Sequence, residues 1–246
     1  MLAIDSGNTR TKWAVIADDG RIQEAGVCLN TALGEFVIPA SWQPCERAIA
    51  ANVAGEGVSA SITALLKKAE IDVVWAKAEA KTLGLKNNYQ SPESLGVDRW
   101  AAMVAAFKCY LNQPACLVVN AGTALTIDAI YQNAFIGGLI VPGFSMMQNA
   151  LLQNIAAVNS QYGQIKTFPL STADASASGV LSAIVGAIVM QADKLESYCQ
   201  DVPTVVMTGG DAPMLMPILT QVFGVKPVLA ENLVLEGLYL MESATS

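Results

Sequence analysis

The chain contains no histidine. Histidine is the side chain that proteins most often use as a general base near neutral pH, and it is the commonest metal ligand. Its absence excludes Ser-His-Asp and Cys-His catalysis, together with every metal site that needs an imidazole ligand. Acid–base chemistry must therefore fall to Asp, Glu, Lys, Tyr or Cys.

Cysteine and positive charge are also sparse. The five cysteines are scattered and form no C-x-x-C pair, so the sequence predicts neither a disulfide framework nor a structural zinc site. Lys and Arg number 14 against 21 Asp and Glu, and this net charge of -7 argues against a basic face for nucleic acid. An anionic small molecule stays open, because backbone N–H groups and one or two local cations can hold a phosphate.

The sequence has no apolar run of the roughly 20 residues that a membrane span needs. The uncharged stretch 175–190 is shorter, is bracketed by Asp174 and Asp193, and is rich in Gly, Ala and Ser. It predicts a buried helix with a flat face, suited to close packing inside the protein or across a dimer. Residues 1–5 follow a buried-strand pattern rather than that of a signal peptide, so we expect a cytoplasmic protein with no membrane partner.

The chain has ample apolar material, since 53% of its 246 residues are hydrophobic. That length suits two domains of about 100–150 residues each. Alternating and helical hydrophobic patterns predict an α/β protein. The predicted strands span residues 2–5, 11–17, 21–28, 46–53, 71–76, 115–120, 124–130, 135–141 and 204–208, and the main helices span 58–69, 97–111, 145–156 and 173–199, with two further helices and a short strand at the end.

The sequence also echoes itself. Residues 4–9 read IDSGNT and residues 119–124 read VNAGTA, each an apolar strand that ends in Asp or Asn before a Gly and a Thr. The two copies stand about one domain apart. We therefore predict two homologous halves, residues 1–113 and 114–246, that face each other across a nucleotide cleft.

The first copy has the composition of a phosphate-binding turn. Gly7 lets a phosphate approach the backbone, Asp5 is placed to bind Mg²⁺ at the end of a strand, and Lys12 supplies a positive charge. An ordinary hairpin would use similar residues. The predicted ATP-binding residues of this loop are Asp5, Ser6, Gly7, Asn8, Thr9, Arg10, Thr11 and Lys12.

Two further glycine turns complete the predicted nucleotide site. Gly122 and Thr123 follow Asn120 in the second copy, where a facing loop could clamp the phosphates from the other side. Gly209 and Gly210 follow a buried strand and could accept adenine or ribose against bare backbone. Each turn alone is also compatible with a plain tight turn. The sequence contains no G-x-x-x-x-G-K-[ST] loop and no G-x-G-x-x-G after a strand, so the other common nucleotide-binding folds have no support from its motifs.

Taken in order, five motifs resemble those of type III pantothenate kinases, which belong to the acetate kinase/sugar kinase/Hsp70/actin superfamily. They are D-x-G-N-T, G-x-D-R, G-T-A-x-T-x-D, G-G-x-I-x-P-G and T-G-G-D, at 5–9, 96–99, 122–128, 137–143 and 208–211. The resemblance implies two actin-like (ribonuclease H-like) halves, each a mixed sheet flanked by helices. It also implies that ATP and Mg²⁺ are used to phosphorylate pantothenate to 4′-phosphopantothenate, the first step of coenzyme A biosynthesis.

The resemblance assigns roles that the residues alone leave open. By itself Asp98 is an acidic residue in the first turn of a helix, whereas the resemblance makes it the general base for the pantothenate hydroxyl. Arg99 would hold pantothenate's carboxylate or steady the phosphoryl group. Tyr89, Gly96 and Val97 would line the pantothenate pocket together with Asp98 and Arg99.

Two implied features concern subunits and cations. Thr172, which locally is typical of a helix N-cap, would reach the pocket of a second subunit and so implies a homodimer. Relatives usually have Asp at the position of Asn120, where it is linked to binding of K⁺ or NH₄⁺. Asn keeps a neutral carbonyl ligand but lacks the charge, so the monovalent-cation requirement stays open here.

Two other functions remain as alternatives. One is a kinase of the same superfamily that acts on another hydroxylated small molecule. The other is a catalytically silent nucleotide-binding regulatory protein, since members of the resembled family have been described as transcriptional accessory factors. The presence of Asp5, Asp98 and Arg99 favours catalysis.

Overall fold

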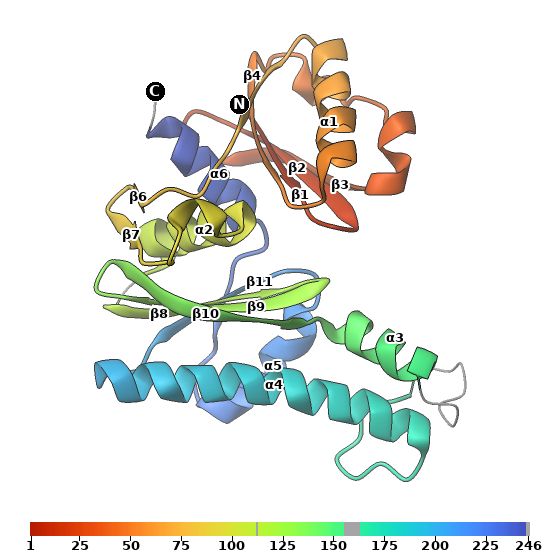
Figure 1. The fold of residues 1–246 in the computed structure, drawn as a ribbon, viewed down its shortest axis with the longest axis vertical. Coiled ribbons are helices and arrows are strands. Elements are labelled where there is room, and N and C mark those ends of the chain that lie inside the picture. Colours follow the sequence, from red (N-terminus) through yellow and green to blue (C-terminus); the bar gives the residue numbers. More distant parts are fainter. Residues whose placement is uncertain (112, 155–162, 245–246) are drawn as a thin grey trace. The chain divides into compact units, whose positions relative to one another are not determined.

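The computed structural model describes residues 1–111, 113–154 and 163–244, which form two compact units (Figure 1). The first unit combines Met1–Tyr110, Asn133–Ile136 and Asn232–Ser246, and the second combines Leu111–Gln132 and Gly137–Glu231. The C-terminal helix therefore belongs to the first unit. The division into domains at residues 113 and 114 stays a prediction.

The first unit is built on a five-stranded mixed sheet in the order β3-β2-β1-β4-β5. Strands β1, β2 and β3 pair antiparallel, whereas β1, β4 and β5 pair parallel. Strands β6 and β7 pair with each other, and β7 pairs with Ala134 and Phe135. The elements are β1 (Leu2–Ser6), β2 (Arg10–Ile16), β3 (Ile22–Leu29), β4 (Arg47–Asn52), α1 (Glu56–Lys68), β5 (Asp72–Trp75), β6 (Lys81–Thr82), β7 (Leu85–Asn87), α2 (Val97–Ala105) and α6 (Leu233–Ser243), with 3-10 turns at Asn30–Glu35, Ala40–Trp42 and Pro92–Ser94.

Alternation along β1 decides which face each side chain joins. Leu2 and Ile4 belong to the core cluster that also contains Ile62 and Leu66 of α1. Helix α6 contacts β1 and β4, and α2 contacts β4. The remaining face of β1, which carries Ala3 and therefore also Asp5, is the one that these two helices cover.

Helices α2 and α6 cross closely because one residue has no side chain. A Cβ added to Gly237 would lie 1.9 Å from the carbonyl oxygen of Ala101. The predicted helix 97–111 ends as an α-helix at Ala105 and continues as a π-helical turn, Ala106–Tyr110. The Tyr110 hydroxyl then donates to Glu236 Oε2 at 2.9 Å, which adds a polar contact between the same segments.

The second unit repeats this sheet order with different residues. Its strands run β12-β11-β8-β9-β10, so both units read 3-2-1-4-5 when their five strands are numbered along the chain. Strands β8 and β9 pair antiparallel, and β8, β11 and β12 pair parallel. The elements are β8 (Ala115–Ala121), β9 (Ala124–Tyr131), β10 (Ala134–Pro142), α3 (Phe144–Asn154), α4 (Thr172–Cys199), β11 (Thr204–Thr208), α5 (Ala212–Phe223) and β12 (Val228–Leu229).

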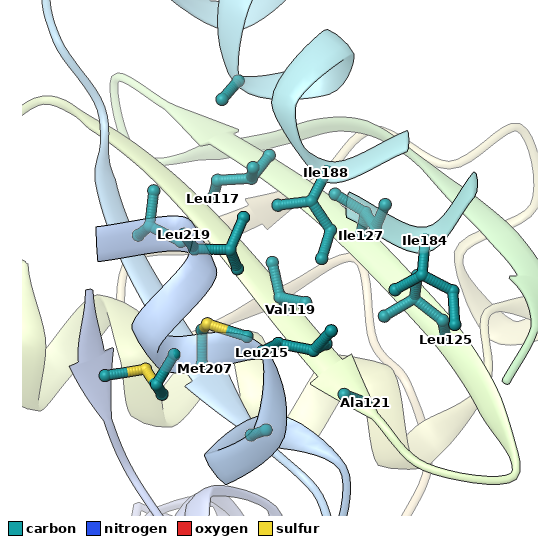
Figure 2. Packing of buried hydrophobic residues seen from close by; sticks show 14 of the residues in the cluster. Leu117, Val119, Ala121, Leu125, Ile127, Ile184, Ile188, Met207, Leu215 and Leu219 are labelled. Atoms are coloured by element: carbon teal, nitrogen blue, oxygen red, sulfur yellow. The ribbon is translucent and has the colours of Figure 1, made fainter. Parts of the chain in front are cut away.

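The core of the second unit lies between its sheet and two helices. Figure 2 shows Val119 and Ile127 from the strands beside Ile184 and Ile188 of α4 and Leu215 of α5. All five side chains are at most 2% exposed. These contacts fix the ends of β8 and β11, where the second and third glycine turns begin.

The long helix α4 is apolar enough, by length and composition alone, to cross a membrane, with a mean hydropathy of 1.6 over its most apolar window. It nevertheless contacts β8 and β9 and supplies one face to the core of the second unit. This agrees with the predicted core helix.

The predicted strands and main helices are present, most with ends shifted by one or two residues. The segment 77–96, for which the sequence patterns predict no strand or helix, carries β6, β7 and a 3-10 turn. Hydrophobic periodicity cannot reveal strands of two or three residues. The end predicted for α3, at Ala156, lies outside the described residues.

Candidate active site

The first loop is a tight connection between β1 and β2. Asp5 pairs with Lys12 and Ser6 with Thr11, so only Gly7, Asn8, Thr9 and Arg10 remain in the turn. The Gly7 N–H donates to the Arg10 carbonyl at 3.1 Å. Asn8, Thr9 and Arg10 are exposed. The predicted loop residues are therefore brought together, with three of them open to solvent at its tip.

The surroundings of Asp5 disfavour an ionised carboxylate. It is half-buried, and its Oδ1 is buried with no hydrogen-bond partner among the residues that the structure describes. Burial, and next the charge of Asp98, raise the pKa of Asp5 to about 7, while Lys12 opposes this shift. The charge of Asp98, which belongs to the same unit, therefore makes ionisation of Asp5 less favourable.

Asp98 lies in the first turn of α2, as the sequence predicts. Gly96 begins the helix and leaves room for the carboxylate, since a Cβ there would lie 2.8 Å from Asp98 Oδ1. The same oxygen accepts the Arg99 N–H at 2.8 Å. Burial raises the pKa of Asp98, and this bond and the charge of Arg99 pull that pKa down. The result is a partly desolvated carboxylate beside a cation.

Buried contacts hold α2 in place. The Trp100 indole N–H donates to Thr82 Oγ1 at 3.1 Å, and Trp100 is 0% exposed. Next to Asp98 in the chain, the Arg99 guanidinium lies 5.9 Å from the centre of the Phe135 ring. Tyr89 stacks on that ring with centroids 6.0 Å apart.

Phe135 therefore joins the residues predicted to bind substrate, and sequence reasoning did not find it. It is 1% exposed and is the second residue of β10, in the short segment Asn133–Ile136 that belongs to the first unit. Gln132 and Asn133, both with positive φ, form the two-residue turn before it. The sequence could have indicated this turn, but no sequence pattern indicates the contact between Phe135 and Tyr89.

A divalent cation fits the surroundings of Asp5. Its buried, unpartnered oxygen is the kind of atom that a hard cation or a cation-bound water would satisfy. In the described part of the chain, no three Asp, Glu or Cys residues gather as a metal cluster. That agrees with Mg²⁺ chemistry, in which one carboxylate and phosphate oxygens share the ion.

The second loop is shorter by one residue. Ala121 pairs with Leu125, and the Gly122 N–H donates to the Ala124 carbonyl at 3.1 Å. Asn120, the counterpart of Asp5, is half-buried, and its Oδ1 would lie 3.9 Å from a Cβ added to Gly122. The position thus presents a neutral carbonyl oxygen near the loop.

Backbone packs tightly around this second loop. A Cβ on Gly143 would lie 2.1 Å from the Gly122 carbonyl oxygen, and one on Gly209, whose φ is +97°, would lie 2.3 Å from that of Ala121. The Asp211 N–H donates to the Ala121 carbonyl at 3.0 Å. The loop and the third glycine turn are therefore in direct contact.

Gly210 follows Gly209 at the entrance to α5, and a Cβ there would meet open space. A shallow pocket beside these turns is lined by Ala121, Gly122, Gly143, Phe144, Asp211 and Met214. Burial raises the pKa of Asp211. The sequence prediction had Gly122, Gly209 and Gly210, but left out Gly143 and Asp211 although both stand in the motifs it used.

Thr172 is the first residue of α4, and it is exposed. The predicted N-cap role was wrong, because Ser171 Oγ accepts the Asp174 N–H at 3.2 Å and caps the helix. Ser171 stands immediately before the helix and Thr172 is already helical, so the hydroxyl one residue earlier has the cap geometry. Thr172 belongs to the second unit, whereas the other residues predicted to bind pantothenate belong to the first. Its role in substrate binding stays a prediction.

A family model described as type III pantothenate kinase matches residues 1–194. A type III pantothenate kinase of Methylobacillus flagellatus is 45% identical over 98% of this chain and 97% of its own length. One of Nitrosospira multiformis is 39% identical over 100% of this chain and 92% of its own.

Solved structures agree on the fold. A ROK family glucokinase from Streptomyces griseus, in complex with glucose and AMPPNP, matches with a TM-score of 0.51 at 13% identity, over 100% of this chain and 99% of that one. At that identity the likeness concerns the actin-like sugar-kinase fold alone, and it agrees with the repeated 3-2-1-4-5 sheets.

Proposed function

The chain belongs to the type III pantothenate kinase family, and we propose on that premise how its residues transfer the γ-phosphoryl group of ATP to pantothenate. The reaction gives ADP and 4′-phosphopantothenate and opens coenzyme A biosynthesis. The observation that carries the assignment to residues is the buried, unpartnered oxygen of Asp5, which has Lys12 as its partner across the strand pair and a pKa that the charge of Asp98 helps to raise.

Asp98 acts as the general base in this proposal. The pantothenate hydroxyl oxygen bonds to the γ-phosphorus, the bond from that phosphorus to the bridging oxygen breaks, and the hydroxyl proton passes to an oxygen of Asp98. Burial supports this role because it raises the pKa of Asp98 and so makes the ionised form a stronger base. Phosphoryl transfer asks little more of its base than orientation, which the α2 contacts provide.

Asp5 holds Mg²⁺ and the first loop holds phosphate. The ion would neutralise charge on the β- and γ-phosphates. Asp5 would share it with phosphate oxygens, and Lys12, its partner across the strand pair, would balance the remaining charge. The loop residues Asn8, Thr9 and Arg10, which are exposed, would bring further polar groups to the phosphate.

Gly122, Thr123, Gly209 and Gly210 would hold the rest of the nucleotide. Support comes from the second unit itself, where the loop after β8 and the turn after β11 are packed backbone to backbone. Bare backbone at such a place suits a flat base or a ribose.

Pantothenate would lie along Tyr89, Gly96, Val97, Asp98 and Arg99, with Phe135 behind. Arg99 is buried and stands beside Asp98, so it is ready either to pair with the carboxylate of pantothenate or to steady the phosphoryl group. The variant Arg99→Lys separates these roles: a rise in the pantothenate KM alone indicates the first, and a fall in kcat alone the second.

Whether a monovalent cation (K⁺ or NH₄⁺) takes part is left open in this proposal, since Asn120 offers a neutral oxygen where the family resemblance implies Asp. The proposed active form is a cytoplasmic homodimer. Along α4 the exposed positions form a stripe that continues from Thr172 toward the C-terminus, namely Ala175, Gly179, Ser182, Ala183, Gly186 and Met190. Small side chains let a second helix approach closely. Sedimentation of Gly186→Lys should give monomers where the unaltered chain gives dimers; dimers of the variant would place the interface elsewhere.

The function is tested by incubating purified protein with Mg²⁺, ATP and pantothenate and detecting 4′-phosphopantothenate. A glucose acceptor and an acceptor-free reaction serve as controls. Product from pantothenate alone is expected. Product from glucose alone would favour another kinase of the superfamily, and bound ATP without any product would favour the regulatory alternative.

A further inference from the structure

Asn30 follows the last residue of β3, and no motif of the site includes it. It nevertheless contacts the first phosphate loop at three points. Its N–H donates to the Thr9 carbonyl at 3.1 Å, its Nδ2 donates to the Gly7 carbonyl at 2.8 Å, and its Oδ1 accepts the Thr11 hydroxyl at 2.9 Å. One side chain thus spans the loop from its first residue to the start of β2.

These bonds continue as a directed chain. The Thr11 hydroxyl has one proton, which it gives to Asn30, so the Ser6 hydroxyl at 3.0 Å must donate to Thr11. The chain runs from Ser6 through Thr11 and Asn30 to the Gly7 carbonyl. Ser6 is 0% and Thr11 4% exposed, so water competes little and each bond strengthens the next.

The chain also fixes the direction of one peptide. The Gly7–Asn8 peptide is trans and planar, so its C=O and N–H point in opposite directions. Because Asn30 binds the C=O, the Asn8 N–H is turned away from Asn30. Ser6 and Thr11 also lie on the opposite face of their strands from Asp5 and Lys12. The hydrogen bonds therefore brace the loop from behind.

We propose that Asn30 is a positioning residue for ATP, which sets the Asn8 N–H toward the phosphate before the nucleotide arrives. The proposal rests on the role of Asp5–Lys12 as an ATP phosphate loop. A loop that is ordered in advance loses less conformational entropy on binding, so the brace acts on nucleotide affinity. It leaves pantothenate untouched.

The variant Asn30→Asp tests this with little change of shape. The introduced carboxylate still accepts the Thr11 hydroxyl, but it places an acceptor against the Gly7 carbonyl. We expect the KM for ATP to rise about tenfold, and the KM for pantothenate and kcat to stay within about twofold.

Asp19→Ala is the matched control at the other end of β3. It removes exposed bonds from the Arg21 N–H and Nε, at 3.1 and 2.7 Å, and should leave the ATP KM unchanged. If Asn30→Asp does not fold, Asn30→Ala gives the same readout without an added charge. A rise in the KM of both substrates together would mean general loosening and would overturn the proposal.

Lys12→Ala separates this proposal from the one it rests on. An ATP KM raised by Lys12→Ala but unchanged by Asn30→Asp and Asn30→Ala would overturn the role of Asn30 and leave the phosphate loop standing. An ATP KM unchanged by every variant would overturn both. Raised ATP KM values in the Asn30 and Lys12 variants, with Asp19→Ala unaffected, would support both.

Discussion

The two loops begin at the same place in the same sheet order, yet the protein holds them by different means. Side chains hold the first: Asn30 Nδ2 donates to the Gly7 carbonyl of the loop, and the Thr11 hydroxyl donates to Asn30 Oδ1. Backbone holds the second, because Gly143 and Gly209 bring neighbouring turns against its carbonyl oxygens. The same sheet order therefore does not decide how a loop is stabilised. Substitutions of the bonding side chains should damage the first loop, and substitutions of the glycines should damage the second.

The loops also differ in charge at the strand end before them. Asp5 is half-buried beside Asp98, and its pKa is raised to about 7. Asn120 stands at the matching end of β8, and its amide side chain does not ionise. At the two matching strand ends, the first unit thus carries an ionisable carboxyl and the second a neutral amide.

The largest expected effect removes the charge at the first strand end. Asp5→Asn should lower kcat about 100-fold or more, because the Mg²⁺ ligand is lost. Steady-state assays over a range of Mg²⁺ concentrations measure this. Activity restored fully by high Mg²⁺ would limit Asp5 to affinity, and unchanged activity would remove it from the metal site.

The same variant should change the pH dependence of stability. Below about pH 4 the Asp5 carboxyl is protonated in both the folded and the unfolded chain. Between there and pH 7 only the unfolded chain ionises, so the unaltered protein should lose about 1–3 kcal/mol of unfolding free energy relative to Asp5→Asn. Denaturant unfolding without Mg²⁺ measures the difference. A difference that stays flat over this range would contradict a raised pKa.

The next effect tests the backbone packing of the second loop. Gly209→Ala forces a side chain onto a residue with φ +97° and against Ala121, and should cost about 2–4 kcal/mol of stability. Gly7→Ala is the matched change in the first loop, where the nearest atom would lie at 3.8 Å, and its cost should stay below about 1 kcal/mol. Thermal unfolding compares the two. Equal costs would break the distinction between the loops.

The smallest effect makes the two strand ends alike. Asn120→Asp adds the carboxylate that the family resemblance implies at this position and should create a rise in activity with added K⁺ of about two- to tenfold. A KCl titration against a NaCl control measures it, with the unaltered chain expected to respond weakly. No response in the variant would show that this position does not govern cation use.

Sequence patterns predicted most of the fold, because β1, β2, β8 and β9 are apolar runs bounded by turn residues. The same turn residues predicted that Gly7 and Gly122 lie in tight turns after their strands. They could not predict Asn30, whose role depends on β3 returning beside the loop, or Phe135, which reaches Tyr89 only through a segment distant in sequence. They also misplaced the cap of α4 by one residue, since Ser171 and Thr172 have the same chemistry and only backbone conformation separates them.

The most direct test of the account is turnover of Asp98→Asn with Mg²⁺, ATP and pantothenate, beside the unaltered protein. The substitution keeps the size of the side chain and its place in α2, so folding and ATP binding should be preserved. The account predicts 4′-phosphopantothenate from the unaltered protein and a fall in kcat of about 100-fold or more in the variant. Turnover of the variant near that of the unaltered protein, with both folded, would contradict the central claim that Asp98 takes the proton.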